Sequence, residues 1–249
     1  MRDNTAKRKL AAGQAVSVVN PTYTSGGLVE LLGRSGFDVI FLDCEHGPAG
    51  WDEVEDMVRA AELAGATPIV RVQSHDHSVI TRALDRGAGG VQVPHVNTRA
   101  EAEAIVKAAK FAPIGHRGFA GGRSALGEKM AEYTARANTE TMVVVMLEET
   151  EALRNLDDIL KVDHIDVFFV APGDLAQSMG LPGQMEHPKV QEAIDAAVKR
   201  ITAAGKVAGV LATPKTVRRY RELGARFLYV GLSAILAPGG ADYLAGIRG

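Results

Sequence analysis

The sequence has little of several features that define other classes of protein. Cys44 is the only cysteine among 249 residues, which excludes disulfides within the chain and zinc sites built from several cysteines. No apolar run is long enough to span a bilayer, and the charged amino terminus lacks the apolar core of a signal peptide, so we expect a cytoplasmic protein. The net charge of -2 and the absence of lysine and arginine runs argue against nucleic acid or a membrane surface as a partner.

What the chain does have is a regular alternation of strand-like and helix-like segments. Eight short apolar segments read as strands, at residues 15–19, 39–42, 68–72, 90–93, 142–147, 167–170, 207–211 and 227–230. Most are nearly continuous apolar sequence, as expected of parallel strands buried on both faces. About eight strand-helix units in a chain of this length predict an α/β protein with a (β/α)8 TIM barrel spanning residues 1–249 as a single domain, ahead of an open doubly wound sheet.

Carboxylates follow two consecutive predicted strands. Glu148 comes directly after residues 142–147, and Asp174 follows residues 167–170 by a few positions. Because parallel strands joined by a crossover helix end at the same edge of a sheet, these two side chains should lie close together. Two carboxylates with open positions for water and substrate are a common site for Mg²⁺ or Mn²⁺. The spacing is equally compatible with two carboxylates that only cap the following helices.

Further polar side chains gather at the ends of the second and third predicted strands. His46 stands beside Asp43 and Glu45, which can orient its imidazole, although a surface histidine with no catalytic role has the same sequence signature. Arg71 lies inside an apolar strand, where a guanidinium must either point into the barrel mouth or find a partner. We favour catalysis for His46 and anion binding, over a structural ion pair, for Arg71.

Two other motifs admit more than one interpretation. His75 and His77 resemble the paired histidines of zinc hydrolases, but Asp76 as a helix N-cap explains the motif more simply. The glycine-rich segment at residues 115–124 carries Arg117 and Arg123, and it is compatible with an anion-binding loop or with a mobile lid.

Lysine is absent from the carboxyl ends of the predicted strands. Covalent imine chemistry needs a desolvated lysine within the site. Any carbonyl reaction at this rim would therefore have to use a metal ion instead of an imine.

Several of these segments together resemble the successive motifs of the HpcH/HpaI aldolase family, the metal-dependent class II pyruvate aldolases related to the citrate lyase β chain. The motifs are FDVIFLDCEHGP, PIVRV, ALDRGAGGVQVPHV, GHRGF, YTARAN, MLEETEAL and VAPGDLAQSMG, and they span nearly the whole chain in order. The resemblance implies a TIM barrel, a homo-oligomer (usually a hexamer) whose last helix is exchanged between neighbouring subunits, and a bound Mg²⁺, Mn²⁺ or Co²⁺.

The resemblance also assigns roles to individual residues. It implies Glu148 and Asp174 as metal ligands, His46 as the catalytic histidine and Arg71 as the arginine that polarises the substrate. It further implies that Asp43 and Asp85 orient this centre and that backbone amides around Ala171 and Gly173 hold the pyruvate carboxylate. This sequence departs from some members at Met146, where they carry glutamine, and at Ala171, which is often glycine.

The predicted reaction is the reversible cleavage of a 4-hydroxy-2-oxo acid, such as 4-hydroxy-2-oxoheptanedioate or a 2-keto-3-deoxy sugar acid, to pyruvate and an aldehyde. Two alternatives stay open. One is an acyl-CoA thioester lyase of the citrate lyase β type, and the other is a barrel without catalytic activity that serves as an interaction scaffold.

Overall fold

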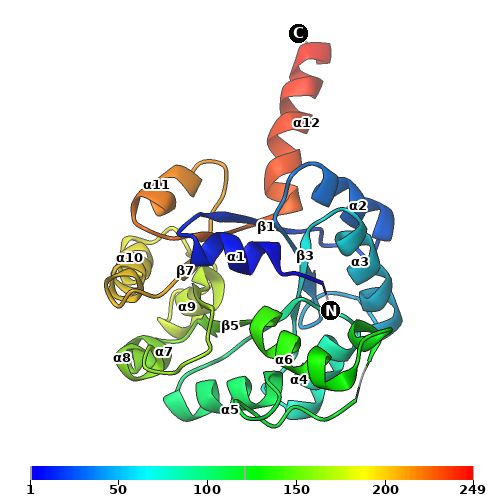
Figure 1. Cartoon of the computed structure of the whole chain (residues 1–249). Helices are drawn as coiled ribbons and strands as arrows, with labels where there is room; N and C mark the ends of the chain where they lie inside the picture. The colour runs from blue at the N-terminus through cyan, green and yellow to red at the C-terminus, as the bar shows by residue number, and fades with distance from the viewer. Residues whose placement is uncertain (1, 121, 249) are drawn as a thin grey trace.

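The computed structural model describes residues 2–120 and 122–248, and it contains a closed barrel of eight parallel strands surrounded by helices (Figure 1). Each strand pairs with the next along the chain, and β8 pairs with β1. This architecture confirms the predicted (β/α)8 barrel. The strands are β1 (Val16–Asn20), β2 (Val39–Asp43), β3 (Thr67–Arg71), β4 (Gly90–Val93), β5 (Met142–Leu147), β6 (Val167–Val170), β7 (Ala208–Leu211) and β8 (Phe227–Gly231).

Helices alternate with the strands. Those between successive strands are α2 (Gly26–Arg34), α3 (Trp51–Leu63), α4 (His77–Asp85), α5 (Arg99–Ala109), α6 (Met130–Glu140), α7 (Thr150–Arg154), α8 (Leu156–Ile159), α9 (Pro172–Ser178), α10 (Pro188–Ala203) and α11 (Val217–Glu222), with a short 3₁₀ turn, η1 (Arg123–Ala125), before α6. Two more helices begin and end the chain, α1 (Thr5–Ala11) and α12 (Leu232–Arg248). Within the described residues, no helix combines the length and the apolar character needed to cross a membrane.

The alternation of side chains along each strand divides the apolar residues into two groups. One group, which includes Val18, Phe41 and Val144, fills the barrel interior, while the other packs outward against the helices. Ala6 and Leu10 of α1 belong to the interior group, so α1 closes the amino-terminal end of the barrel. Polar side chains at the other end of the strands are therefore the ones open to ligands, as in other barrels of this type.

The last helix does not return to the barrel. α12 extends away from the body of the molecule (Figure 1), and Leu232 is the only buried residue among those described for it. Four large apolar side chains of this helix are exposed, namely Leu236, Tyr243, Leu244 and Ile247.

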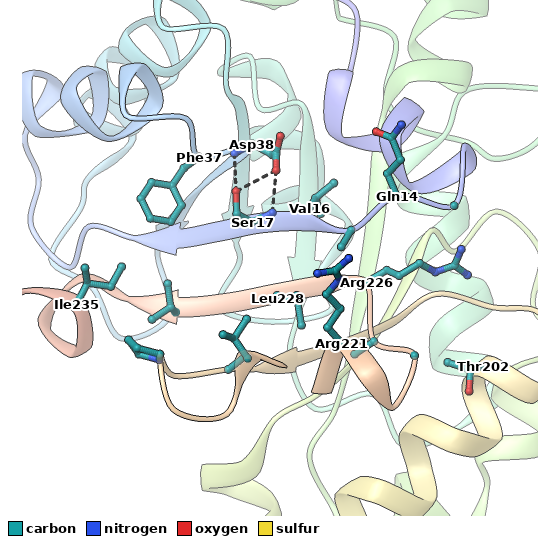
Figure 2. Close-up of a pocket in the computed structure, with 18 residues that line it drawn as sticks. Gln14, Val16, Ser17, Phe37, Asp38, Thr202, Arg221, Arg226, Leu228 and Ile235 are labelled. Atoms are coloured by element: carbon teal, nitrogen blue, oxygen red, sulfur yellow. Dashed lines mark hydrogen bonds between the residues drawn. The ribbon is translucent and has the colours of Figure 1, made fainter. Parts of the chain in front are cut away.

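The outer face of β1 and β8 is left uncovered as a result. A groove of about 940 Å³ runs over these strands beside α11, and its apolar lining includes Phe37, Val217, Leu228, Val230 and Ile235 (Figure 2). The other strand pairs of a TIM barrel are covered by an outer ring of helices. This groove therefore marks a gap in that ring, and the chain's own α12 does not fill it.

Candidate active site

An arginine held by two carboxylates forms one side of the barrel mouth. Asp43 and Arg71 are the last residues of β2 and β3, and the register of the two strands places them side by side. The guanidinium of Arg71 donates from Nε and Nη2 to the two carboxylate oxygens of Asp43, at 2.9 and 2.6 Å. Its Nη1 lies 2.9 Å from Oε2 of Glu45. The predicted position of Arg71 at the mouth is thus observed, with the guanidinium fixed by ion pairs.

The electrostatics of this pair favour the ionised forms. Burial alone would raise the pKa of Asp43, but the Arg71 guanidinium and the backbone N–H groups of His46 and Glu45 hold that pKa below its usual value. Burial would lower the pKa of Arg71, and the facing Asp43 and Glu45 carboxylates raise it instead. A permanent positive charge therefore stands at the mouth of the barrel.

The turn after β2 places His46 at the surface of the mouth. Oδ1 of Asp43 accepts hydrogen bonds from the backbone N–H groups of Glu45 and His46, at 3.1 and 3.3 Å. Gly47 permits this tight turn, because a Cβ there would collide with the carbonyl oxygen of Asp43. The imidazole is 68% exposed, and its nearest carboxylate is Glu45, at 3.9 Å from Nε2. The expectation that Asp43 orients the imidazole is not met in this structure, because its oxygens bind Arg71 and the backbone.

A buried carboxylate with an unpartnered oxygen follows β5, two strands along the barrel from Arg71. Glu148 follows β5 and is 1% exposed; its Oε1 accepts the backbone N–H of His95 at 2.6 Å, and its Oε2 is buried without a partner. Burial raises the pKa of Glu148 to about 7, and the charges of Asp174 and Glu45 add to that rise against the lowering effect of His95. Glu148 caps no helix, which removes the capping interpretation for this residue.

Asp174 completes the pair of carboxylates. It is exposed in the first turn of α9, where the N-cap residue is Ala171. No hydrogen bond to its carboxylate is found in the part of the chain that the structure describes, and its charge acts on Glu148. β5 and β6 thus bring the two carboxylates close enough for their charges to interact, while their role as metal ligands stays a prediction.

The chemistry of this pair fits a divalent cation with oxygen ligands. The unpartnered Oε2 of Glu148 and the free carboxylate of Asp174 are hard oxygen donors, and a cation would offset the repulsion between them. No cluster of three or more metal-binding side chains occurs among residues 2–120 and 122–248. Glu148 and Asp174 would therefore hold the ion as two protein ligands, with its other positions left to water and substrate.

The backbone at the start of α9 offers a further polar group. Ala171 is buried at the end of β6, Pro172 has no N–H, and Gly173 is exposed as the second residue of the helix. An N–H in the first turn of a helix has no partner within that helix. The N–H of Gly173 is thus available to a bound carboxylate, and the predicted role of Ala171 and Gly173 stays a prediction.

The histidine pair of the third loop does not form a zinc site. Nε2 of His75 lies 2.6 Å from the carbonyl oxygen of Pro94, while the ring of His77 stacks on that of His116 at 5.1 Å. The two imidazoles thus contact different groups, and no cluster of three or more metal-binding side chains is found among the described residues. The N-cap position of Asp76 is as predicted, although its side chain makes no capping hydrogen bond.

Asp85 is not where the resemblance places it. It is the last residue of α4, which leads away from the end of β3 toward the start of β4, and its Oδ1 accepts from Nη2 of Arg117 at 2.8 Å. Within this chain, Asp85 therefore belongs to an ion pair away from the mouth, and the role that the resemblance implies for it stays a prediction. The spacing of a motif along the sequence does not reveal at which end of the barrel a helical residue lies.

Both arginines of the glycine-rich segment 115–124 pair with outer helices and do not face the mouth. Arg117 is buried and pairs with Asp85, and Nη2 of Arg123 lies 2.6 Å from Oε2 of Glu62, near the end of α3. The interpretations as an anion-binding loop or lid of this site are therefore wrong for both arginines of this chain. Gly121, within the same segment, lies outside the described residues.

Sequence reasoning missed other polar residues of the mouth. His95 follows β4 with a φ of 55°, and its Nδ1 lies 3.0 Å from Oε1 of Glu149. Burial would lower the pKa of His95, but the Glu148, Glu149 and Glu45 carboxylates raise it. Asn20 and Tyr229 hydrogen bond to each other at 2.9 Å on β1 and β8. Asn20 ends β1 and His95 closely follows β4, which was the available signal for these two, whereas Tyr229 lies within β8; none carries a distinctive motif.

A lysine with a depressed pKa is present, but it is far from the mouth. Burial lowers the pKa of Lys110 to about 7, and its Nζ donates to the backbone carbonyls of Asn138 and Thr141 at 2.8 and 2.7 Å. Thr141 precedes β5, whereas Glu148 follows it, so a strand length of about 20 Å separates them. Lys110 is therefore a structural group at the closed end of the barrel.

We expect no imine between this protein and an oxo acid. Because the only lysine with a strongly depressed pKa among the described residues is at the closed end, incubation with pyruvate and borohydride should leave the mass of the protein unchanged. Intact-mass spectrometry makes the measurement, with an imine-forming aldolase as the positive control. A stable adduct mapped to any lysine would contradict this expectation.

Comparison with known proteins gives a consistent picture. The family model for HpcH/HpaI aldolase/citrate lyase matches residues 23–237. The chain is 36% identical to the 2-keto-3-deoxy-L-rhamnonate aldolase of Klebsiella pneumoniae over 94% of this chain and 88% of that protein. It is 37% identical to the 4-hydroxy-2-oxo-heptane-1,7-dioate aldolase of the same bacterium, over 98% and 93%. A family protein from Burkholderia cenocepacia has a crystal structure that superposes with a TM-score of 0.92 at 29% identity, covering 99% of this chain and 100% of that one.

Proposed function

The chain belongs to the HpcH/HpaI aldolase/citrate lyase family, and on that premise we propose that it is a divalent-metal-dependent aldolase. Its reaction is the reversible cleavage of a 4-hydroxy-2-oxo acid to pyruvate and an aldehyde, within one catalytic domain spanning residues 1–249. The substrate classes expected from the sequence are 4-hydroxy-2-oxoheptanedioate and 2-keto-3-deoxy sugar acids, which agree with the names of the relatives. A cytoplasmic location stays a prediction of the sequence.

One observation carries this proposal. A permanently charged guanidinium, Arg71, and a buried carboxylate with an unpartnered oxygen, Glu148, end neighbouring parts of the same barrel mouth. Arg71 can stabilise an oxygen that becomes negatively charged, and Glu148 can bind a cation. An enolate formed from a 2-oxo acid needs both partners at once.

Family members generally depend on a divalent metal, and we assign its binding to Glu148 and Asp174. When bound, Mg²⁺, Mn²⁺ or Co²⁺ supplies a Lewis acid that stabilises negative charge on the oxygens of a 2-oxo acid. The two carboxylates contribute by fixing its place at the end of β5 and at the start of α9. The backbone N–H of Gly173 is placed to help hold the substrate carboxylate.

Arg71 stabilises the negative charge that develops on the ketone oxygen during carbon-carbon cleavage. A guanidinium carries five N–H donors, and the contacts to Asp43 and Glu45 use one each on Nε, Nη2 and Nη1. Two N–H groups therefore remain for a substrate oxygen. Asp43 positions the guanidinium group of Arg71, so it acts through Arg71 and not through His46.

His46 takes the proton of the 4-hydroxyl group in cleavage and returns it in condensation. Its exposure on the rim leaves the imidazole free to reach the alcohol, directly or through one water molecule. Glu45 lies nearest to the ring and also contacts Arg71, so it couples the base to the guanidinium.

A thioester lyase acting on an acyl-CoA is the second candidate, because the matching family model includes citrate lyases. One assay distinguishes the two functions. Purified protein with Mn²⁺ is offered 4-hydroxy-2-oxo acids and malyl- or citramalyl-type CoA esters, and pyruvate or acetyl-CoA release is measured. Pyruvate release from the free acids supports the aldolase, activity confined to CoA esters supports the lyase, and no turnover together with no Mn²⁺ binding indicates a non-catalytic barrel.

The protein is further proposed to be a homo-oligomer, with a hexamer as the expected assembly. α12 exposes Leu236, Tyr243, Leu244 and Ile247, while the groove over β1 and β8 presents an apolar lining that none of the described elements covers. A helix and a groove that both need an apolar partner suit an exchange in which α12 of one copy covers the groove of another.

Light scattering at micromolar concentration should therefore give a mass several times that of one chain. The double variant Leu244→Asp with Ile247→Asp should shift the mass toward that of a monomer, because it places charges on the apolar contact. Asp242→Asn, a polar change on the same helix, is the matched control and should keep the assembly. A wild-type protein that is monomeric would contradict the exchange of α12.

A further inference from the structure

β4 points a buried glutamine into the barrel. Val91 and Val93 belong to the outward-packing apolar group, so Gly90 and Gln92 are the residues of this strand that face the interior. Gln92 is 1% exposed, and its side-chain oxygen has no hydrogen-bond partner within the described residues. It is a polar group placed among apolar ones and left unsatisfied.

The position of Gln92 relates it to the candidate active site. β4 lies between β3, which ends in Arg71, and β5, which leads into Glu148. Gln92 is the register partner of Arg71 on one side and of Val144 on the other. The amide therefore belongs to the floor of the mouth, between the guanidinium and the buried carboxylate.

A buried amide oxygen without a partner is rare in native proteins because it loses its hydrogen bonds to water and gains none in return. Val144 and Met146 of β5 offer only apolar side chains to it. A group supplied by a ligand explains why a glutamine is kept here, because it would satisfy the amide when the site is filled.

The ligand group can be identified by elimination, and this step rests on the proposed function. The carboxylate and the ketone oxygen of a 2-oxo acid are taken by Arg71, the metal ligands and the Gly173 N–H. The alcohol that comes from the aldehyde is taken by His46 on the exposed rim. The polar group left for the floor is a substituent on C3 of the 2-oxo acid, the carbon that forms the new bond.

We propose that Gln92 is a specificity-determining residue that hydrogen bonds to a hydroxyl group on C3 of the oxo-acid donor. A hydroxyl donates its proton to the amide C=O, the acceptor that lacks a partner here. The methyl group of pyruvate leaves the same oxygen unpaired. Gln92 therefore raises the use of 3-hydroxylated 2-oxo acids as donors relative to pyruvate, which stays a donor in the proposed reaction.

The test compares two donors, hydroxypyruvate and pyruvate, with one aldehyde and saturating Mn²⁺. The wild-type protein should use both donors. Gln92→Leu should lower the ratio of kcat/KM for hydroxypyruvate over pyruvate by about tenfold or more, as for the loss of one buried hydrogen bond to a substrate hydroxyl. Gln184→Leu, which changes an exposed glutamine in the loop between α9 and α10, is the matched control and should leave the ratio unchanged.

The remaining outcomes each decide the matter. An equal fall for both donors means that Gln92 contacts a group common to them and overturns the proposal, as does an unchanged ratio. A Gln92→Leu protein with a lower melting temperature and an unchanged ratio assigns the amide to folding. A wild-type protein that uses neither donor overturns the proposed function itself, whereas one that uses pyruvate but not hydroxypyruvate overturns only the role of Gln92.

Discussion

Glu148→Ala is expected to lower aldol cleavage by about 10³-fold or more. Glu148 supplies the buried oxygen of the proposed metal site, and the cation contributes several kcal/mol of transition-state stabilisation, each 1.36 kcal/mol of which is about tenfold in rate. The affinity for Mn²⁺, measured by calorimetry, should fall along with the rate. A variant with normal turnover and normal Mn²⁺ binding would remove Glu148 from the metal site.

Two companion variants separate metal binding from folding. Glu149→Ala changes the neighbouring carboxylate, which lies 3.0 Å from Nδ1 of His95 and is not assigned as a metal ligand, so it should keep most of the Mn²⁺ affinity. Glu148→Gln keeps the shape of the side chain and removes its charge, so it should lose the metal while remaining folded.

The effect of Glu148→Gln on stability should depend on pH. Burial raises the folded-state pKa of Glu148 from 4.5 to about 7, so the metal-free fold bears a growing cost as pH rises through that interval. Below pH 4.5 the carboxyl is neutral in both folded and unfolded states, and the cost is absent. Glu148→Gln should therefore raise the melting temperature of the metal-free protein at pH 8 more than at pH 5.

His46→Ala and Arg71→Ala should affect two reactions in different ways. His46→Ala should lower aldol cleavage by roughly 10²–10⁴-fold, the usual range for a lost general base. Oxaloacetate decarboxylation also forms a pyruvate enolate but requires no alcohol deprotonation, so His46→Ala should largely spare it. Arg71→Ala should lower both reactions by about 10²-fold or more, because both develop charge on the same oxygen.

The comparison is meaningful only for variants that bind Mn²⁺ normally and keep their melting temperature. Arg71→Lys refines it, because lysine keeps the charge but cannot reproduce the bidentate contact with Asp43. An equal loss in both reactions for His46→Ala would show that His46 is not the base that acts on the hydroxyl group. Retention of decarboxylation by Arg71→Ala would show that the guanidinium does not stabilise the enolate.

The barrel was predictable because its strands are buried on both faces. Such strands read as continuous apolar runs, and the predicted ranges agree with β1 to β8 to within one or two residues. The sequence did not predict α1 and α6, because α1 buries only Ala6 and Leu10 and α6 has three buried residues, so neither shows a strong apolar period. Their positions depend on contacts with distant parts of the chain.

The candidate site was predictable where a polar residue ends an apolar strand. Arg71 and Glu148 satisfy that pattern, and the structure brings them to one mouth. The partner of Asp43 could not be predicted from the sequence. The nearby His46 suggested a contact with its imidazole, whereas the register of β2 and β3 places Arg71 beside Asp43. Gln92 was missed for a related reason: a single polar residue in a short strand gains meaning only when its burial and missing partner are known.

Pyruvate release after removal and return of the metal tests the central claim most directly. The protein is treated with a chelator, dialysed and assayed with a 4-hydroxy-2-oxo acid before and after the addition of Mn²⁺, with Glu148→Ala in parallel. We predict that cleavage is lost on chelation and restored by Mn²⁺ in the wild-type protein and that it is not restored in the variant. Cleavage that survives exhaustive chelation, with the protein shown to be free of metal, would contradict a metal-dependent aldolase built on Glu148 and Asp174.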